Sequence, residues 1–298
     1  EARKQAIETV LNYLNRYQCD SAIDVIESIP YDDKDPEFIK AYASAYACRA
    51  GYSSTKLVGT DLTTITAPIT SLWGLLAKFS NARTNDGPDN VHYRDMEIAI
   101  NALLYAGGTA RDENPTAVRR GRHFKIKEAE QLNFFALYLL LDQIGRFSYH
   151  YGDTNTTGVK GSANRGANDC LVNYDMTLTN DAAIAIGVLI AAVPTGTCNL
   201  AIDKGHPDFG VTASLNVSRL CEGVVWVNNL FEILSSIAAT LHPSMSTGLT
   251  AVTTAISAAR TTLTAAKAAS YELTKTLSQD KCESDNATST ANLQFQSF

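Results

Sequence analysis

Six cysteines are the residues of this chain whose chemistry is easiest to foresee. They are Cys19, Cys48, Cys170, Cys198, Cys221 and Cys282, and they are spread over most of the sequence. Structural zinc sites use closely spaced cysteine and histidine ligands, and no CxxC motif or Cys/His cluster occurs here. The spacing therefore argues against zinc and leaves disulfides or free thiols.

We expect disulfides rather than free thiols. Cys170 and Cys282 lie beside polar segments, where a buried thiol has little reason to be. Pairing neighbours in sequence gives the bridges Cys19–Cys48, Cys170–Cys198 and Cys221–Cys282, although the sequence alone does not select one pairing. The alternative is six reduced thiols in the core of a cytosolic protein. Bridged cysteines would indicate an oxidising, extracytoplasmic compartment.

Residues for catalysis or metal binding do not cluster along the chain. The five histidines show no HExxH or HxxxH spacing, so each is expected to be a surface or structural residue. The GxSxG motif of serine hydrolases is absent as well. We therefore expect no catalytic residue, no metal site and no cofactor, and a protein that is not an enzyme.

A glycine-rich segment, YGDTNTTGVKGSANRGAND at 151–169, carries no periodic apolar residues. Its glycines resemble a phosphate-binding loop only superficially, because GxxxxGK[ST] is missing. Gly, Asn and Thr are typical of loops, so this segment is predicted to be a long loop and the main internal boundary. It separates a helical region at 1–150 from a second helical region at 170–298, the two packing as one extended unit.

One concentrated basic patch, RRGRHFKIK at 119–127, contains Arg119, Arg120 and Arg122. Such a patch could contact lipid phosphates or an acidic partner surface. The other interpretation is a solvated connection that leads into the next helix. The patch has too few aromatic residues for a platform that binds single-stranded nucleic acid.

A second candidate interface is the aromatic segment RFSYHYGD at 146–153, with Phe147, Tyr149 and Tyr151. Aromatic side chains here could line a groove or anchor an interface, since tyrosine supplies contact area at low entropic cost. Equally, they could cap the core of a helical bundle.

Composition narrows the class of protein. The chain has 298 residues, 45% of them apolar and 19% charged, which is typical of a folded protein. A net charge of −6 argues against nucleic acid as the main partner. The apolar runs, such as 182–193, are shorter than the roughly 20 residues of a membrane-spanning helix. Because the chain begins at Glu1, we expect that a leader, or a lipid-bearing cysteine, preceded it.

Apolar residues at helical spacing predict successive helices in the first half, at about 6–14, 22–29, 38–46, 66–79, 96–104 and 126–150. Asp35-Pro36-Glu37 is a strong helix start, and Gly51 fits the end of the same helix. Residues 109–125 read as a connection. The run NFFALYLLLDQIG is apolar on nearly all sides, which favours a central position in a bundle.

The first helices resemble tetratricopeptide repeats, helical hairpins of about 34 residues. In the stretch AYASAYACRAGYSS (41–54), small residues would let two helices approach closely. Ala22 takes the place of the small residue of the family's second helix. Gly51 and Tyr52 fall near its glycine–x–aromatic turn, shifted by one residue. The family's tryptophan, leucine and first glycine are missing, so the resemblance is to degenerate repeats and covers roughly residues 3–60.

The second half carries the clearest periodicity. Apolar and small residues from Val252 to Leu277 alternate in steps of four and three, a heptad repeat. A second apolar helix is predicted at 220–241. Because the connection between the two segments is short, we expect the heptad segment to pack on this helix of the same chain rather than on a second copy of the protein. The predicted fold class is therefore all-α, with tetratricopeptide-like hairpins and a long antiparallel helical hairpin with a heptad seam.

Taken as a whole, the chain resembles bacterial envelope lipoproteins with a tetratricopeptide-like core, some of which accompany solute transporters. This resemblance implies a non-enzymatic scaffold or assembly protein of the periplasm or outer membrane, with protein partners and self-association. Attachment to a membrane surface through an upstream lipid is also implied. The alternative is a ligand-binding accessory of a transporter, with an apolar pocket for a small molecule.

Overall fold

The computed structural model describes residues 2–53, 55, 90–151, 217–237 and 278–286, and within them the fold is all-α with no strand. These residues form eight helices. They are α1 (Ala2–Leu14), α2 (Cys19–Glu27), α3 (Pro36–Arg49), α6 (Val91–Leu104), α7 (Ala117–His123), α8 (Ile126–Tyr151), α10 (Val217–Ile237) and α12 (Gln279–Asn286).

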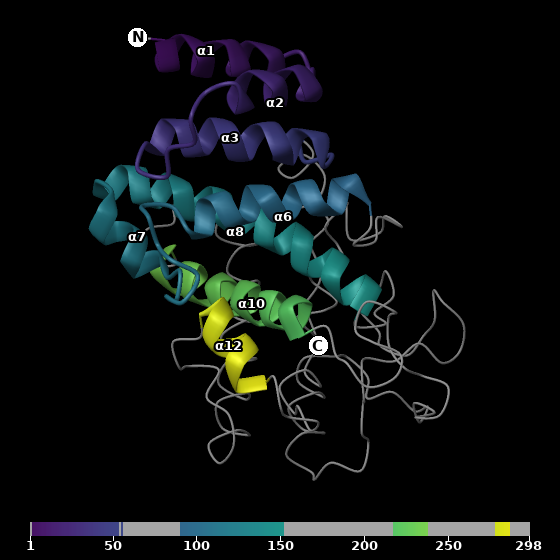
Figure 1. The fold of residues 1–298 in the computed structure, drawn as a ribbon, viewed down its shortest axis with the longest axis vertical. Helices are drawn as coiled ribbons and strands as arrows, with labels where there is room; N and C mark the ends of the chain where they lie inside the picture. The colour runs from purple at the N-terminus through teal and green to yellow at the C-terminus, as the bar shows by residue number, and fades with distance from the viewer. Residues whose placement is uncertain (1, 54, 56–89, 152–216, 238–277, 287–298) are drawn as a thin grey trace.

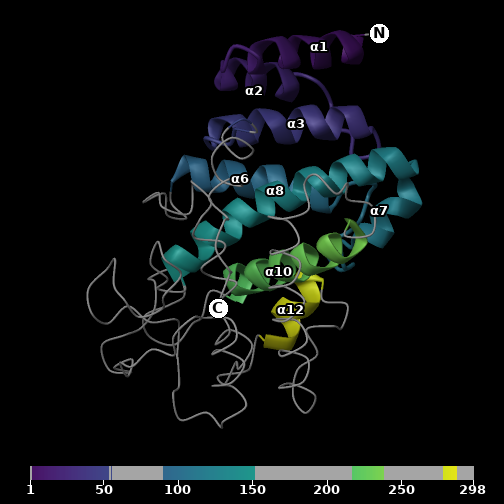
Figure 2. The same cartoon turned by 180° about the vertical axis from the view of Figure 1, so that it is seen from behind.

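The helices are stacked in layers along the long axis of the molecule. The hairpin of α1 and α2 lies at one end, followed by α3, then by α6 with α8, and then by α10 and α12 (Figures 1 and 2). Each layer packs on the next: α3 contacts α1, α2, α6 and α8, while α10 contacts α7, α8 and α12. Helices from both halves of the sequence therefore share one core.

Local sequence signals set the ends of several helices. The Asp35 carboxylate accepts hydrogen bonds from the backbone N–H groups of Glu37 and Phe38, which caps α3. Gly51 lies just beyond the end of α3 with φ +82°, a left-handed conformation that costs glycine little. The predicted start and stop of this helix are thus both confirmed.

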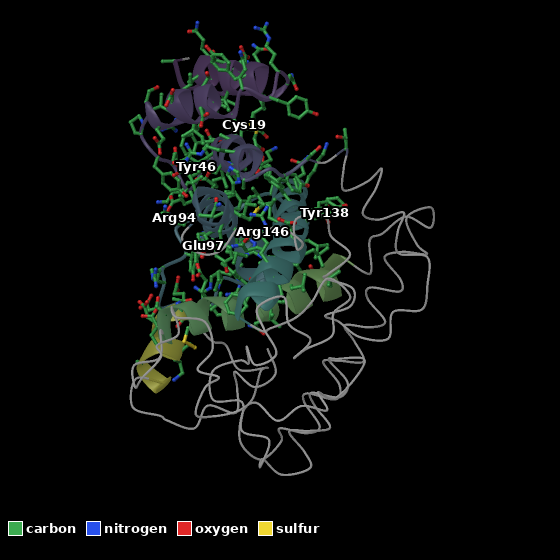
Figure 3. The ribbon with its side chains drawn as sticks, turned by 90° about the vertical axis from the view of Figure 1, so that its right-hand side faces the viewer. Cys19, Tyr46, Arg94, Glu97, Tyr138 and Arg146 are labelled. Carbon is green, nitrogen blue, oxygen red and sulfur yellow. A yellow bond between two sulfur atoms is a disulfide. The ribbon has the colours of Figure 1, made fainter. Side chains whose placement is uncertain are left out.

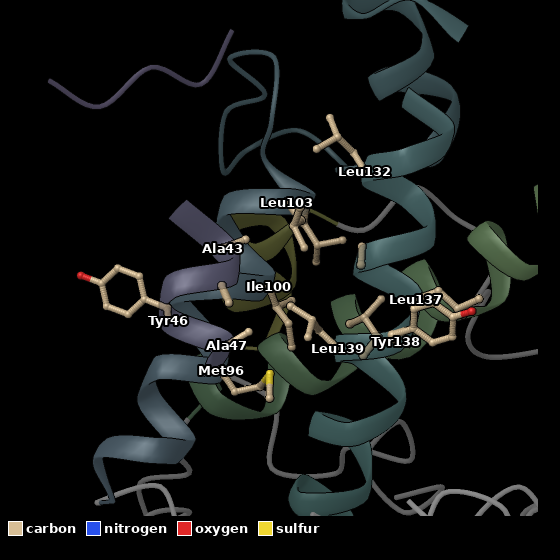
Figure 4. Close-up of a cluster of buried hydrophobic side chains, with 14 of the residues drawn as sticks. Ala43, Tyr46, Ala47, Met96, Ile100, Leu103, Leu132, Leu137, Tyr138 and Leu139 are labelled. Carbon is tan, nitrogen blue, oxygen red and sulfur yellow. The ribbon is translucent and has the colours of Figure 1, made fainter. Parts of the chain in front are cut away.

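The small residues of α3 pack against larger side chains of the neighbouring layer (Figure 4). The cluster includes Ala43 and Ala47 of α3, Met96, Ile100 and Leu103 of α6, and Leu132, Leu137 and Leu139 of α8. The single stripe predicted for this helix contains Phe38, Ala41, Tyr42, Ala45 and Tyr46. Since α3 has layers on both sides, its buried surface is wider and also includes Ile39, Ala43 and Ala47. Alanines on the second face allow α6 to come close.

Helix α8 spans 126–151 as predicted and runs through the centre of the stack, buried along most of its length. One of the tightest approaches joins it to α10. A Cβ atom added at Gly223 of α10 would lie 2.6 Å from Cζ of Phe147. Glycine at this position therefore lets the two helices cross at close range.

Two elements differ from the sequence-based expectation. Residues 117–123, predicted to be part of a connection, form the helix α7, which Thr116 caps by accepting a hydrogen bond from the N–H of Arg119. Residues 279–286, where the sequence analysis predicts no helix, form α12, which packs on α10. The helix predicted at 66–79, residues 152–169 of the glycine-rich segment and the heptad segment lie outside the described residues. Tyr151, the first residue of the glycine-rich segment, is the last residue of α8.

Candidate functional site

Two clefts open on the described surface, and each is lined by residues from several helices. The first, which we call the aromatic cleft, has a volume of about 650 Å³. It lies where α1, α3 and α8 meet. Its lining residues are Leu14, Asn15, Tyr17, Lys40, Ser44, Cys48, Tyr52, Ser53, Thr55, Gln131, Phe134, Phe135 and Tyr138.

Aromatic side chains form much of the wall of the aromatic cleft. Phe134 and Tyr138, one turn apart on α8, make an edge-to-face pair with ring centroids 4.5 Å apart. Tyr52 approaches Phe135 from the end of α3, with centroids 6.0 Å apart. Burial raises the pKa of Tyr138 to about 12, so its hydroxyl stays neutral at physiological pH.

The edge of the aromatic cleft carries one cation and one strongly exposed ring. The Lys40 ammonium donates hydrogen bonds to Glu37 and, at 3.0 Å, to the Gln131 side-chain oxygen. Tyr17 lies in the turn after α1 with φ 57° and is 72% exposed. Tyrosine is one of the residue types enriched among the anchors of protein interfaces.

The second cleft, which we call the polar cleft, has a volume of about 670 Å³. It lies among α3, α6, α10 and α12 and the loops that precede α3 and follow α6. Its lining residues are Tyr31, Tyr42, Ile98, Asn101, Ala102, Tyr105, Thr109, Arg111, Ser218, Glu222, Val225, Trp226 and Gln279.

Tyrosine rings define one side of the polar cleft. Tyr31 and Tyr42 meet edge to face at 5.1 Å between ring centroids, and Tyr42 lies 4.9 Å from Tyr46. The Tyr46 hydroxyl donates to the Glu27 carboxylate. Because Tyr31 is 54% exposed, part of this tyrosine cluster faces solvent.

Arg111 and Glu222 are the charged residues in the described lining of the polar cleft, and Asp280 and Glu283 lie beside it as ion-pair partners of Arg111. The Arg111 guanidinium lies 3.4 Å from the Asp280 carboxylate and 3.3 Å from that of Glu283. The pKa of Tyr105 is raised to about 12, mainly by burial. The positive charge of Arg111 lowers this pKa, whereas the carboxylates of Glu222, Asp280 and Glu283 raise it further. Three carboxylates and one guanidinium therefore act on the hydroxyl of Tyr105.

The three arginines of the predicted basic patch have different surroundings. Arg119 pairs with Glu113, while Arg122 is exposed to solvent. Arg120 is fully buried, and its guanidinium donates to Asn133 Oδ1 at 2.6 Å and to the carbonyl oxygens of Leu104 and Pro115. Burial lowers the pKa of Arg120 to about 10, an effect that Glu232 opposes. Arg120 thus belongs to the core and not to a basic surface.

Of the aromatic residues of the predicted interface at 146–153, Phe147 is the one whose side chain the structure describes. Phe147 is buried and meets Trp226 of α10 edge to face, with centroids 5.9 Å apart, so it caps the core. The side chains of Tyr149 and Tyr151 lie outside the described residues. Neither cleft was predicted from the sequence, because its residues come from helices far apart in the chain.

Two of the three expected disulfides are present. Cys19–Cys48 links the start of α2 to the last turn of α3, and Cys221–Cys282 links α10 to α12. Cys170 and Cys198 lie outside the described residues. Disulfides indicate an oxidising, extracytoplasmic environment.

Charged side chains connect α3, α6 and α8, and Arg146 of α8 is one of those labelled in Figure 3. Arg49 of α3 makes a two-bond ion pair with Asp95 of α6, at 2.6 and 2.8 Å. Arg146 of α8 lies 3.2 Å from Asp142 and donates to the carbonyl oxygen of Ala50, which follows α3. A cation at the C-terminal end of a helix is favourable. We assign these charges a structural role.

Neither a metal site nor a membrane span is found in the described part of the chain. Its His, Cys, Asp and Glu side chains form no group of three that could hold a metal ion. Its helices include none with the length and apolarity needed to cross a membrane. Comparison of the chain with protein-family models, with curated proteins and with solved structures gives no match.

Proposed function

We propose that this protein is a non-enzymatic extracytoplasmic scaffold, built on tetratricopeptide-like hairpins, that binds proteins through its helices and associates with copies of itself. The observation that carries this proposal is the aromatic cleft. It combines a wall of Phe134, Phe135 and Tyr138 with the exposed Tyr17 at its edge. Protein interfaces favour this combination of rigid aromatic side chains and a polar rim.

The layered stacking supports the same proposal. Repeated helical hairpins pack only on their neighbours, which leaves extended surfaces open to partners. The disulfides Cys19–Cys48 and Cys221–Cys282 are in keeping with a site of action outside the cytoplasm, and the periplasm or outer membrane of a bacterium is the proposed location. Attachment through an upstream lipid is part of this proposal.

Light scattering of the full chain at micromolar concentration tests self-association. The wild type is expected to form a dimer or larger oligomer. Tyr17→Ser is expected to weaken association at least about tenfold, because an anchoring tyrosine is worth about 1.4 kcal/mol or more at an interface. Tyr31→Ser, which removes another exposed tyrosine at the polar cleft, is the matched control and should associate normally.

Two results would contradict the proposal. One is a monomeric wild type throughout the concentration range. The other is unchanged association of Tyr17→Ser, which would show that the aromatic cleft does not mediate self-association.

A second candidate function is that of a ligand-binding accessory of a transporter. The volume of the aromatic cleft, about 650 Å³, falls within the range of small-molecule sites, roughly 300–1,000 Å³. Native mass spectrometry of the purified full chain should then detect a bound small apolar molecule. If the Phe134→Ser variant no longer carries this molecule, its site is the aromatic cleft. A spectrum of the bare protein alone would argue against this second function.

A further inference from the structure

We infer that the polar cleft is a binding site for a small organic cation with apolar substituents, of the quaternary ammonium class. This inference concerns a different surface from the aromatic cleft and does not depend on the proposed scaffold function. Its grounds are the tyrosine rings of the polar cleft, its balance of charge and its size.

Three tyrosine side chains form part of the wall of the polar cleft. Tyr31, Tyr42 and Tyr105 come from three separate elements and line the same space. A quaternary ammonium group is attracted to the faces of aromatic rings by the ring quadrupole, with about 0.5–2 kcal/mol per contact depending on desolvation. Its methyl groups would also contact Ile98, which is 36% exposed and lines the cleft.

The charges of the polar cleft favour a cation over an anion. Among the described lining residues, Arg111 carries the one positive charge, and it already pairs with Asp280 and Glu283. Glu222 adds a further carboxylate to the lining. Asp280 and Glu283 do not line the cleft themselves, but with Arg111 they form an ion-pair group of net charge −1 at its border. An anionic ligand would therefore meet net repulsion from this group, and a cation net attraction.

The floor of the polar cleft is fixed by packing rather than by the ligand. Trp226 is fully buried and rests edge to face on Phe147. The wall at α12 is held by the Cys221–Cys282 bridge and by Gln279, whose amide donates to the Ser218 carbonyl oxygen at 2.9 Å and to Glu283 at 2.7 Å. A preformed wall reduces the entropy lost on binding. The volume of about 670 Å³ suits a small molecule.

Isothermal titration of the full chain with two probes of the same shape tests the inference. Choline carries a trimethylammonium group, and 3,3-dimethyl-1-butanol is its neutral counterpart. Choline is expected to bind at least about tenfold more tightly, a difference of about 1.4 kcal/mol. The difference should shrink as salt is added, since screening weakens the carboxylate contribution.

Variants then test separately what the carboxylates and what the aromatic rings contribute to choline binding. Glu222→Gln should weaken choline about tenfold and leave the neutral probe unchanged. Asp280→Asn, on an exposed side chain, repeats this test at a position that is not needed for packing. Tyr105→Leu should weaken choline about fivefold or more, whereas Tyr105→Phe keeps the ring face and should bind it as the wild type does. Tyr17→Leu, in the aromatic cleft, is the control.

Three outcomes would overturn the inference. The first is equal affinity for the two probes, which would indicate a neutral ligand such as a sugar. The second is no binding of choline at millimolar concentration. The third is a loss of choline affinity in Tyr17→Leu equal to that in Tyr105→Leu, which would place the site elsewhere.

Discussion

Arg120 and Arg122 lie two positions apart in α7, yet their surroundings are opposite. The guanidinium of Arg120 is buried and donates hydrogen bonds to the carbonyl oxygens of Leu104 and Pro115. Arg122 faces solvent. Removing a buried charge that satisfies several acceptors leaves those acceptors unpaired in a region of low dielectric, which costs more than the loss of a surface charge.

Arg120→Met is therefore expected to lower the free energy of unfolding by about 3 kcal/mol. Arg122→Met, its matched control in the same helix, should change it by less than about 0.5 kcal/mol. Urea unfolding followed by circular dichroism gives both values. Equal effects of the two substitutions would mean that Arg120 is not buried in solution.

At the scale of elements, the crossing of α8 and α10 depends on one glycine. The Cζ atom of Phe147 lies 2.6 Å from the place where a Cβ atom would stand at Gly223. Gly121 of α7 offers a contrast, since a Cβ atom there would meet nothing within 4 Å. The same substitution should therefore have opposite effects at the two positions.

Gly223→Ala is expected to destabilise the protein by about 1–3 kcal/mol, because Phe147 or the helix must move to make room. Gly121→Ala should stabilise it by roughly 0.5–1 kcal/mol, since alanine is the better helix former and no contact opposes it. Thermal unfolding of the two variants beside the wild type measures the difference. A stabilising Gly223→Ala would show that α8 and α10 do not cross as closely as described.

The whole molecule is held together by covalent links as well as by its layers. The bridge Cys19–Cys48 spans 29 positions and fastens α2 to α3, while Cys221–Cys282 spans 61 positions and fastens α12 to α10. A crosslink restricts the unfolded chain, and the effect grows with the length of the closed loop. The short helix α12 depends on this link most, since its packing partner is α10.

Replacing both cysteines of one bridge by serine is expected to lower the free energy of unfolding by roughly 3–4 kcal/mol. The loss for Cys221–Cys282 should equal or exceed the loss for Cys19–Cys48, because the closed loop is longer. Hydrogen exchange should show lost protection in α12 when Cys221 and Cys282 are replaced. It should show lost protection in α2 and α3 when Cys19 and Cys48 are replaced. Loss of protection spread evenly over all helices in both variants would argue against these local roles.

The sequence by itself determined the helical class, the span of α8 and both ends of α3. It did not select a cysteine pairing, but the assumption that neighbours pair gave the two described bridges. The helical features depend on local periodicity and on capping residues such as Asp35 and Gly51. Helix capping and periodicity act over a few residues, so a single sequence records them directly.

Only the tertiary structure decided which charges and aromatic rings are buried and where the clefts lie. Arg120 belongs to a basic run and Phe147 to an aromatic one, but their burial follows from the approach of α10 and the loops around α7. The polar cleft joins Tyr31 to Trp226, which are distant in sequence. Burial and cavities arise when separate helices pack together, and no local pattern in the chain encodes that contact.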